Sequence, residues 1–254
     1  MIAARPEARA VTIVAAHQPH YLPWLGYLDK LAKADRFIVM DDLQYEEQNY
    51  QNRQRLKLND GPHWFTVPLL RGSQTDRIVD KKIDNTGHGS RHHWQRRTWR
   101  TLQVHYGRAP YFAQYAQELE IVYTRRWNWL IDLQLHTLDL ASTWLGIATP
   151  IVRASTLRLR GAKTDRILDF CEKTGAKVYL TGAGGSTGYL DTDKLAAGGV
   201  ATMWQRFTHP GYPQRYPGCG FVSHLAFVDL LLNCGPESAA VIWPTATQAS
   251  QSVS

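Results

Sequence analysis

Short apolar runs alternate with helically spaced apolar residues in the first part of the chain. Residues 11–16 form an apolar run typical of a buried strand. Leu25, Leu28 and Leu31 then recur at helical spacing, with Pro23 just inside the expected start. This pattern predicts a strand followed directly by a helix.

The same alternation returns farther along the chain. Further strands are expected at residues 36–40, 64–70 and 177–181, the last one behind a helix from about 164 to 173. Helices and short apolar strands that interleave predict an α/β fold, with a mainly parallel sheet and flanking helices. In such sheets, ligands bind at the carboxyl ends of the strands.

Residues 91–146 interrupt this alternation with a largely helical pattern that ends at Gly146, which is placed to cap the last helix. A chain of 254 residues suits one large domain. We therefore expect a single α/β domain over residues 1–244 with a helical insertion at about 91–146. The small, polar residues 245–254 are expected to form a flexible tail.

The composition and charge indicate which partners the protein could bind and in which cellular compartment it works. The net charge of +7 favours an anionic small molecule, a nucleotide, a sugar phosphate or RNA, although a solvated basic surface explains it as well. The three cysteines have no regular spacing, which argues against disulfides and thiolate metal sites. The apolar run near the amino terminus is too short to span a membrane and does not have the order of a signal peptide. These features predict a cytoplasmic protein without membrane contact.

Polar loops follow three of the predicted strands. His17 and Gln18 begin the first loop, Asp41 and Asp42 the second, and a glycine-rich stretch at residues 182–191 forms the third. Parallel strands would bring these loops to one sheet edge and so to one cleft. Ordinary turn residues at strand ends are the alternative explanation for each loop.

These loops contain the candidate chemistry. His17 is the best general acid or base, because its unperturbed pKa lies near the working pH. Asp41 and Asp42 are the other catalytic candidates, as groups that orient the imidazole, hold Mg²⁺ or bind an amine. Lys30 and Arg53 are the candidate anion contacts, although both could equally be surface charges.

Other residues offer alternative chemistry. Cys171 could serve a cysteine-dependent acyltransferase, but it lies on the apolar helical face of Ile167 and Leu168, which favours a buried thiol. The seven arginines at residues 91–126 are interleaved with aromatic residues and could bind a nucleotide or RNA. A solvated arginine face explains this stretch equally well.

One combination of motifs resembles the WbqC-like family over nearly the whole chain. It comprises His17-Gln18-Pro19, Tyr21-Leu22-Pro23-Trp24-Leu25-Gly26-Tyr27, Asp29-Lys30, Asp41-Asp42, Gln44-Tyr45, Asn52-Arg53, Trp64-Phe65-Thr66-Val67-Pro68, Gly182 to Leu190 and Phe207 to Tyr216. The resemblance implies a place in O-antigen or other surface-polysaccharide biosynthesis, with glycine transfer as a suggested activity. Together with the strand-end loops it gives the expected substrate-binding set: Gln18, Tyr21, Trp24, Lys30, Gln44, Tyr45, Asn52, Arg53, Thr66, Gly182, Gly184, Gly185, Tyr189 and Gln214.

A second likeness concerns the opening strand, turn and helix, which resemble the ATP-binding start of nucleotidyltransferases and pantothenate-synthetase-like ligases. That likeness implies ATP with Mg²⁺ as the cofactor. The sequence departs from their HxGH signature, since Tyr27 follows Gly26 where a histidine is needed. No spacing typical of protein-only metal ligands is present.

The leading hypothesis is therefore an amide-forming ligase or aminoacyl transferase that places glycine or a similar unit on an amino sugar or small metabolite. Backbone amides near Gly184 would form its oxyanion or phosphate cradle. The donor would be an aminoacyl-tRNA or another carrier-bound acyl group. The alternatives are a nucleotide- or tRNA-binding protein without chemistry of its own and the cysteine-dependent acyltransferase.

Overall fold

The computed structural model describes residues 13–86, 94–182, 184, 188 and 190–244. The chain divides into two compact units, each built from separate stretches of sequence. Unit 1 comprises Met1–His17, Lys30–Val39 and Thr149–Arg206, and unit 2 comprises Gln18–Asp29, Met40–Ala148 and Phe207–Ser254. The boundary between Asp29 of unit 2 and Lys30 of unit 1 falls within helix α1 (Leu25–Ala32).

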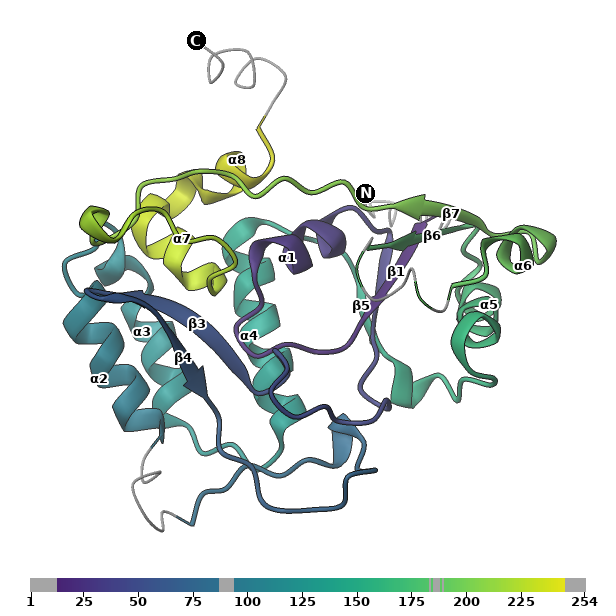
Figure 1. The fold of residues 1–254 in the computed structure, drawn as a ribbon, viewed down its shortest axis with the longest axis horizontal. Coiled ribbons are helices and arrows are strands. Elements are labelled where there is room, and N and C mark those ends of the chain that lie inside the picture. The colour runs from purple at the N-terminus through teal and green to yellow at the C-terminus, as the bar shows by residue number, and fades with distance from the viewer. Residues whose placement is uncertain (1–12, 87–93, 183, 185–187, 189, 245–254) are drawn as a thin grey trace, which may run out of the picture. The chain divides into compact units, whose positions relative to one another are not determined.

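Unit 1 contains a parallel sheet of five strands in the order β5-β2-β1-β6-β7 (Figure 1). The strands are β1 (Ile13–His17), β2 (Arg36–Val39), β5 (Ile151–Arg153), β6 (Val178–Thr181) and β7 (Ala201–Trp204). The α/β class with a mainly parallel sheet is thereby confirmed, as are the strands expected near residues 11–16, 36–40 and 177–181. The short strands β5 and β7 were not expected from the sequence.

The order of these strands reverses direction between β1 and β6. From β1 the chain proceeds outward to β2 and β5, then returns to the other side of β1 to form β6 and β7. Strands β1 and β6 are direct neighbours in register from Ile13 opposite Val178 to Ala15 opposite Leu180. In open α/β sheets, such a switch point leaves a crevice at the carboxyl ends of the two central strands.

Two helices of unit 1 pack beside the β6 and β7 side of the sheet, α5 (Lys163–Thr174) and α6 (Thr192–Ala197). Helix α5 confirms the helix expected from about 164 to 173. Gly175 ends it with a φ of 70°, a left-handed conformation that glycine adopts without steric cost. The Asp191 carboxylate caps the amino terminus of α6 by accepting from the Lys194 amide.

Unit 2 begins with an antiparallel hairpin that is separate from the parallel sheet. Strand β3 (Arg53–Leu58) pairs with β4 (Gly61–Thr66), with Arg55 opposite Trp64. The expectation of a strand over residues 64–70 was therefore wrong in its bounds. Phe65 and Val67 are buried, but the strand ends at Thr66. The apolar run therefore belongs partly to one strand of a hairpin and partly to the loop that follows it.

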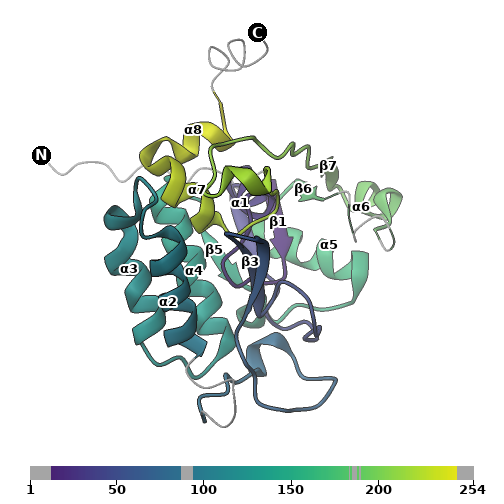
Figure 2. The same cartoon turned by 60° about the vertical axis from the view of Figure 1, so that its left-hand side comes forward.

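Three helices of unit 2 follow, α2 (Trp94–Tyr106), α3 (Phe112–Thr124) and α4 (Leu130–Leu145), and Figure 2 shows them side by side. They confirm the helical pattern expected after residue 91. Gly146 caps α4 with a φ of 67°, as expected from its position.

The last part of unit 2 consists of α7 (Phe227–Cys234) and α8 (Ser238–Ile242), with short 3-10 turns η4 (Pro217–Cys219) and η5 (Gly235–Glu237) beside them. A further turn, η1 (Ile78–Asp80), lies earlier in this unit, and η2 (Ala154–Thr156) follows β5 in unit 1. Every residue of α7 is buried, which makes it a core helix of unit 2.

Residues 245–254, expected to form a tail, lie outside the described residues, and the prediction of a single domain over 1–244 stays a prediction. No helix in the described ranges has the length and apolar character needed to cross a bilayer.

Candidate functional site

Lys30 lies at the carboxyl edge of the unit 1 sheet, at the switch between β1 and β6. Its ammonium is 3.5 Å from the carbonyl oxygen of Ala16, the residue before His17. A Cβ atom added at Gly182, directly after β6, would lie 3.8 Å from Lys30 Nζ and 3.9 Å from Gln205 Oε1. The structure thus brings Lys30 to the ends of the two central strands, as expected for a ligand contact.

The Lys30 ammonium is buried without a compensating charge among the described residues. Its side chain is 6% exposed, and it forms no ion pair with any described carboxylate. Burial lowers the pKa of Lys30 from 10.5 to about 8. This buried cation, with one long hydrogen bond, lies at the sheet edge where ligands bind. It is suited to bind an anionic group, which would neutralise its charge.

His17 ends β1 opposite Val39 of β2 and is partly exposed. The glycine stretch begins directly after Thr181 of β6, whose neighbour Leu180 pairs with Ala15 of β1. Two of the three predicted strand-end loops therefore start at adjacent strands of one sheet. Gly184 is exposed, whereas Gly185 and Tyr189 lie outside the described residues.

Asp41 and Asp42 follow β2 and belong to unit 2, in a loop held by a later segment. The backbone carbonyl of Asp41 accepts from the Val79 amide at 2.8 Å. The charges of both aspartates help to raise the pKa of Arg77, although its largest cause is the hydrogen bond to Asp80. Asp41 is buried and Asp42 is partly exposed, so Asp42 is the more accessible carboxylate.

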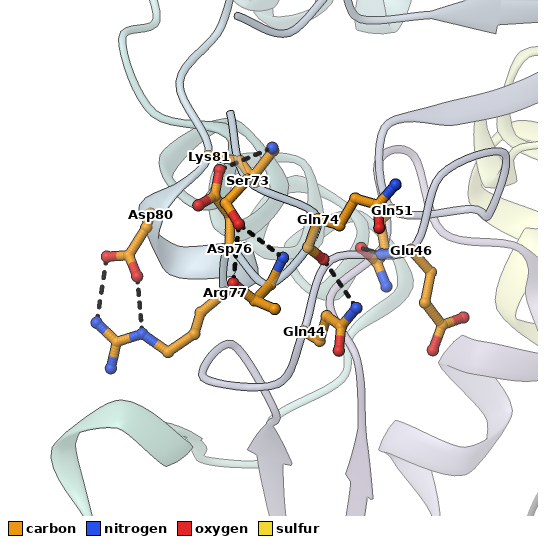
Figure 3. Close-up of polar contacts among 10 residues, drawn as sticks. Gln44, Glu46, Gln51, Ser73, Gln74, Asp76, Arg77, Asp80 and Lys81 are labelled. Carbon is orange, nitrogen blue, oxygen red and sulfur yellow. Dashed lines mark hydrogen bonds and ion pairs between the residues drawn. The ribbon is translucent and has the colours of Figure 1, made fainter. Parts of the chain in front are cut away.

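Gln44 and Tyr45 extend the same loop, and both donate to backbone carbonyls of the segment 74–76. Figure 3 shows the contact of Gln44. Gln44 Nε2 donates to the Gln74 carbonyl at 2.8 Å, and the Tyr45 amide donates to the Asp76 carbonyl at 2.8 Å. Burial, with a smaller contribution from Glu47, raises the pKa of Tyr45 to about 12. Its ring lies 5.0 Å from Lys81 Nζ, so the phenol is placed to pack against a cation.

Gln18 belongs to a glutamine network that sequence reasoning missed. Its Oε1 accepts from Gln51 Nε2 at 3.1 Å, and its Nε2 donates to Glu46 at 3.2 Å. Gln134 of α4 donates to the carbonyls of Gln51 at 2.7 Å and Pro19 at 3.2 Å. These bonds fix the segment after His17 in unit 2. No sequence signal marks Gln134, because its partners lie 83 and 115 positions away.

Several predicted substrate contacts have structural roles. Tyr21 is buried and its hydroxyl pairs with that of Tyr123 at 2.9 Å. Asn52 is buried and donates to the Val67 carbonyl at 2.9 Å. Thr66, in contrast, is exposed at the end of β4. Substrate contacts by these residues stay predictions, and the geometry of Tyr21 and Asn52 indicates packing.

Gln214 lies in a buried polar network centred on Asp229 of α7. The fully buried carboxylate accepts from Tyr106 at 2.7 Å, Tyr212 at 2.9 Å and Gln214 at 3.1 Å. Burial raises the pKa of Asp229, while these hydrogen bonds and the charge of Lys57 oppose the shift. The network ties the loop around Gln214 to the core of unit 2.

Trp24 and Arg53 face an exposed aromatic region of unit 2. The Trp24 ring centroid lies 4.8 Å from that of His224, and the Arg53 guanidinium carbon lies 4.3 Å from the Trp64 ring centroid. Stacked guanidinium and aromatic groups are common in sites for ringed or anionic ligands.

Only some of the aromatic rings of the arginine stretch are buried. Trp94, Tyr106 and Tyr123 are buried, whereas Arg96 and Arg100 are exposed on α2. Stacking of bases on these three rings is therefore not supported. Trp99, Tyr111 and Phe112 are partly exposed, so both explanations of this stretch stay open.

Cys171 is buried, as its position on the apolar helix face predicted, and burial raises the pKa of its thiol to about 12. A thiol with such a pKa is a poor nucleophile near neutral pH. It lines a hollow of about 620 Å³ that also involves Ala176, Lys177 and Val200. Ala176 and Lys177 directly precede β6, and Val200 directly precedes β7. The hollow therefore lies at the amino ends of these strands, away from Lys30.

We expect Cys171→Ser to leave turnover within about threefold of wild type, since the thiol is protonated near neutral pH. The variant is expected to lose about 1–3 kcal/mol of stability, because a hydroxyl replaces a buried sulfur. Turnover and denaturant unfolding check both parts. A loss of activity in a variant that is still folded would restore the cysteine hypothesis.

The described residues contain no group of three or more His, Cys, Asp or Glu side chains placed to hold a metal ion. Asp41 and Asp42 alone do not make such a set. Mg²⁺ beside a nucleotide needs only one or two protein carboxylates, so the cation role expected for Asp41 and Asp42 stays a prediction.

Comparisons with known proteins agree with the motifs. The model of the WbqC-like protein family matches residues 18–241. The chain is 31% identical over 228 residues to the "Uncharacterized protein Rv1507c" of Mycobacterium tuberculosis (strain ATCC 25618 / H37Rv), covering 89% of this chain and 95% of that protein. No solved structure shows a significant match. The chain therefore belongs to the WbqC-like protein family.

Proposed function

We propose that this protein is an acyl-transfer enzyme that joins glycine or a similar acyl unit to the amine of an amino sugar or small metabolite. The observation that carries the proposal is the buried Lys30 ammonium at the switch between β1 and β6, which forms no ion pair with a described carboxylate. Acyl donors activated as phosphates, thioesters or esters of a carrier bear the anionic groups that such a cation would bind.

In the proposed reaction, the acceptor nitrogen attacks the acyl carbonyl carbon and a new C–N bond forms. The bond from that carbon to the oxygen or sulfur of the donor breaks, and its electron pair leaves on that atom. His17 takes the proton from the nitrogen, and Lys30 stabilises the negative charge on the donor. The roles expected for Asp41 and Asp42 stay predictions. Use of ATP with Mg²⁺ to form the donor, and a role in surface polysaccharides or natural products, stay predictions.

A thermal-shift screen with nucleotides, coenzyme A and nucleotide sugars tests the anion site. A ligand that binds only the folded protein raises the unfolding temperature by mass action. We expect at least one phosphate-bearing compound to stabilise the wild type and to have no effect on Lys30→Met. Stabilisation of both proteins to the same extent would remove Lys30 from the proposal.

His17→Ala is expected to reduce turnover of the screened donor by about 100-fold or more, because general base catalysis typically contributes a factor of this size. The measurement is steady-state amide formation over a range of pH. His17→Gln, which keeps a polar side chain without a titrating group, serves as the control for packing. Turnover within about threefold of wild type in His17→Ala would show that another group accepts the proton.

A further inference from the structure

A second region, in unit 2, has the chemistry of a binding surface. Trp64 of β4 is 43% exposed. The guanidinium carbons of Arg53 and Arg55 lie 4.3 and 5.6 Å from its ring centroid, and the Tyr50 ring centroid lies 5.6 Å away. An exposed indole is thus bordered by two guanidinium groups and a second ring.

A second exposed ring belongs to the segment of unit 2 that Arg55 contacts. Phe221 is 48% exposed, and its ring centroid is 5.7 Å from that of His209, which lies 5.4 Å from His224. Arg55 joins the two clusters, because its Nη2 donates to the Ser223 carbonyl at 3.2 Å. The charge of Arg55 also contributes, after burial, to the lowered pKa of His224.

The surface defined by Tyr50, Arg53, Arg55, Trp64, Phe221 and His224, here called the aromatic-basic surface, contains no acidic side chain. Neither guanidinium group forms an ion pair with a carboxylate in the described ranges. Cations placed beside exposed rings are complementary to a ligand that alternates negative charges with flat rings. Single-stranded nucleic acid has this alternation, and proteins bind it by stacking bases on aromatic side chains beside basic groups.

We propose that the aromatic-basic surface binds single-stranded nucleic acid. One base stacks at Trp64 and another at Phe221, and Arg53 and Arg55 contact the phosphates between them. Arg55 contacts the Trp64 ring and bonds the carbonyl of Ser223, two residues after Phe221. Two separate exposed rings favour a strand over a mononucleotide, which offers one base. This binding goes beyond the acyl-transfer proposal and uses neither His17 nor Lys30.

Fluorescence anisotropy with a labelled oligouridylate of about ten nucleotides tests the proposal. We expect Trp64→Ala and Phe221→Ala each to weaken binding by about tenfold, the loss typical of one stacked base. Arg55→Gln is expected to reduce the slope of log affinity against log salt concentration by about 0.7, since one phosphate contact is removed. Circular dichroism establishes that each variant is folded.

Trp129→Ala is the matched control, because Trp129 is also exposed in unit 2 (37%) and lies 4.8 Å from a cation, Lys82. It should bind the oligonucleotide as the wild type does. Absence of binding, or equal losses in Trp64→Ala and Trp129→Ala, would overturn the proposal. Binding of adenosine monophosphate or of an RNA duplex as tightly as the single strand would also overturn it.

Lys30→Met separates this proposal from the acyl-transfer function. The variant should bind the oligonucleotide normally even though it has lost the anion site of unit 1. Loss of oligonucleotide binding in folded Lys30→Met would show that the strand is held at the Lys30 site and would overturn the assignment to the aromatic-basic surface.

Discussion

Lys30→Met is expected to increase stability at pH 7 by up to about 3 kcal/mol while abolishing anion binding and turnover. The folded-state pKa of about 8 lies below the ordinary value of 10.5, and one pKa unit corresponds to about 1.4 kcal/mol. Methionine has a similar length and no charge, so it removes the cost of burying the ammonium. Denaturant unfolding and the anion screen measure the two effects.

The burial of Lys30 should also make the stability of the wild type depend on pH in a defined direction. Between pH 8 and 10.5 the unfolded chain binds a proton at Lys30 that the folded protein has already released. The wild type should therefore gain stability as the pH rises through this window, and the gain should be absent from Lys30→Met. Equal pH profiles for the two proteins, or a less stable variant at pH 7, would contradict the buried-cation interpretation.

Asp229→Ala is expected to reduce the free energy of unfolding by about 3–5 kcal/mol, the range seen when one partner of a buried charged network is removed. The variant leaves the hydroxyl groups of Tyr106 and Tyr212 without their acceptor. It also leaves the buried Lys57 ammonium without the carboxylate that compensates it. Urea unfolding monitored by fluorescence measures the loss.

Asp139→Ala is the matched control for Asp229, because Asp139 is an exposed acid on a helix of the same unit. It should change stability by no more than about 0.5 kcal/mol. Tyr106→Phe removes a hydroxyl that donates to Asp229 and accepts from the Lys57 amide, and should cost about 1–3 kcal/mol. A loss below about 1 kcal/mol for Asp229→Ala would mean that the network does not hold the loop around Gln214.

The Asp229 network also affects the aromatic-basic surface. Gln214 accepts from the Val222 amide at 2.9 Å and donates to the Val222 carbonyl at 2.8 Å, which fixes the residue after Phe221. A buried carboxylate thereby positions an exposed ring. Gln214, expected to bind substrate, is better explained as a residue that positions this loop.

The sequence predicted those parts of the fold that depend on local patterns. The apolar runs of β1, β2 and β6 and the glycine at the end of α4 each leave a signal within a few residues. Strands β5 and β7, with three and four residues, are too short for a reliable period. The hairpin was missed because Lys57, a charged residue inside β3, is buried by contacts to Gln214 and Gly220, far along the chain.

Some residues of the candidate site could be predicted from local patterns and others could not. Placement of His17 and Lys30 followed from the rule that ligands bind at the carboxyl ends of parallel strands. The role of Gln134 and the carboxylate of Asp229 did not, because each depends on partners distant in sequence. A polar residue in an apolar helix gives no indication of which backbone carbonyl or hydroxyl group it meets.

Lys30 is proposed to be a buried cation that binds an anion at the switch between β1 and β6. Its most direct test is an NMR titration of Lys30 in protein with ¹³C-labelled lysine, without and with saturating inorganic pyrophosphate. We predict a pKa of about 8 in the free protein and a clear increase with pyrophosphate, because an adjacent anion favours the charged form. A pKa near 10.5 in the free protein, or no change on addition of pyrophosphate, would contradict the claim.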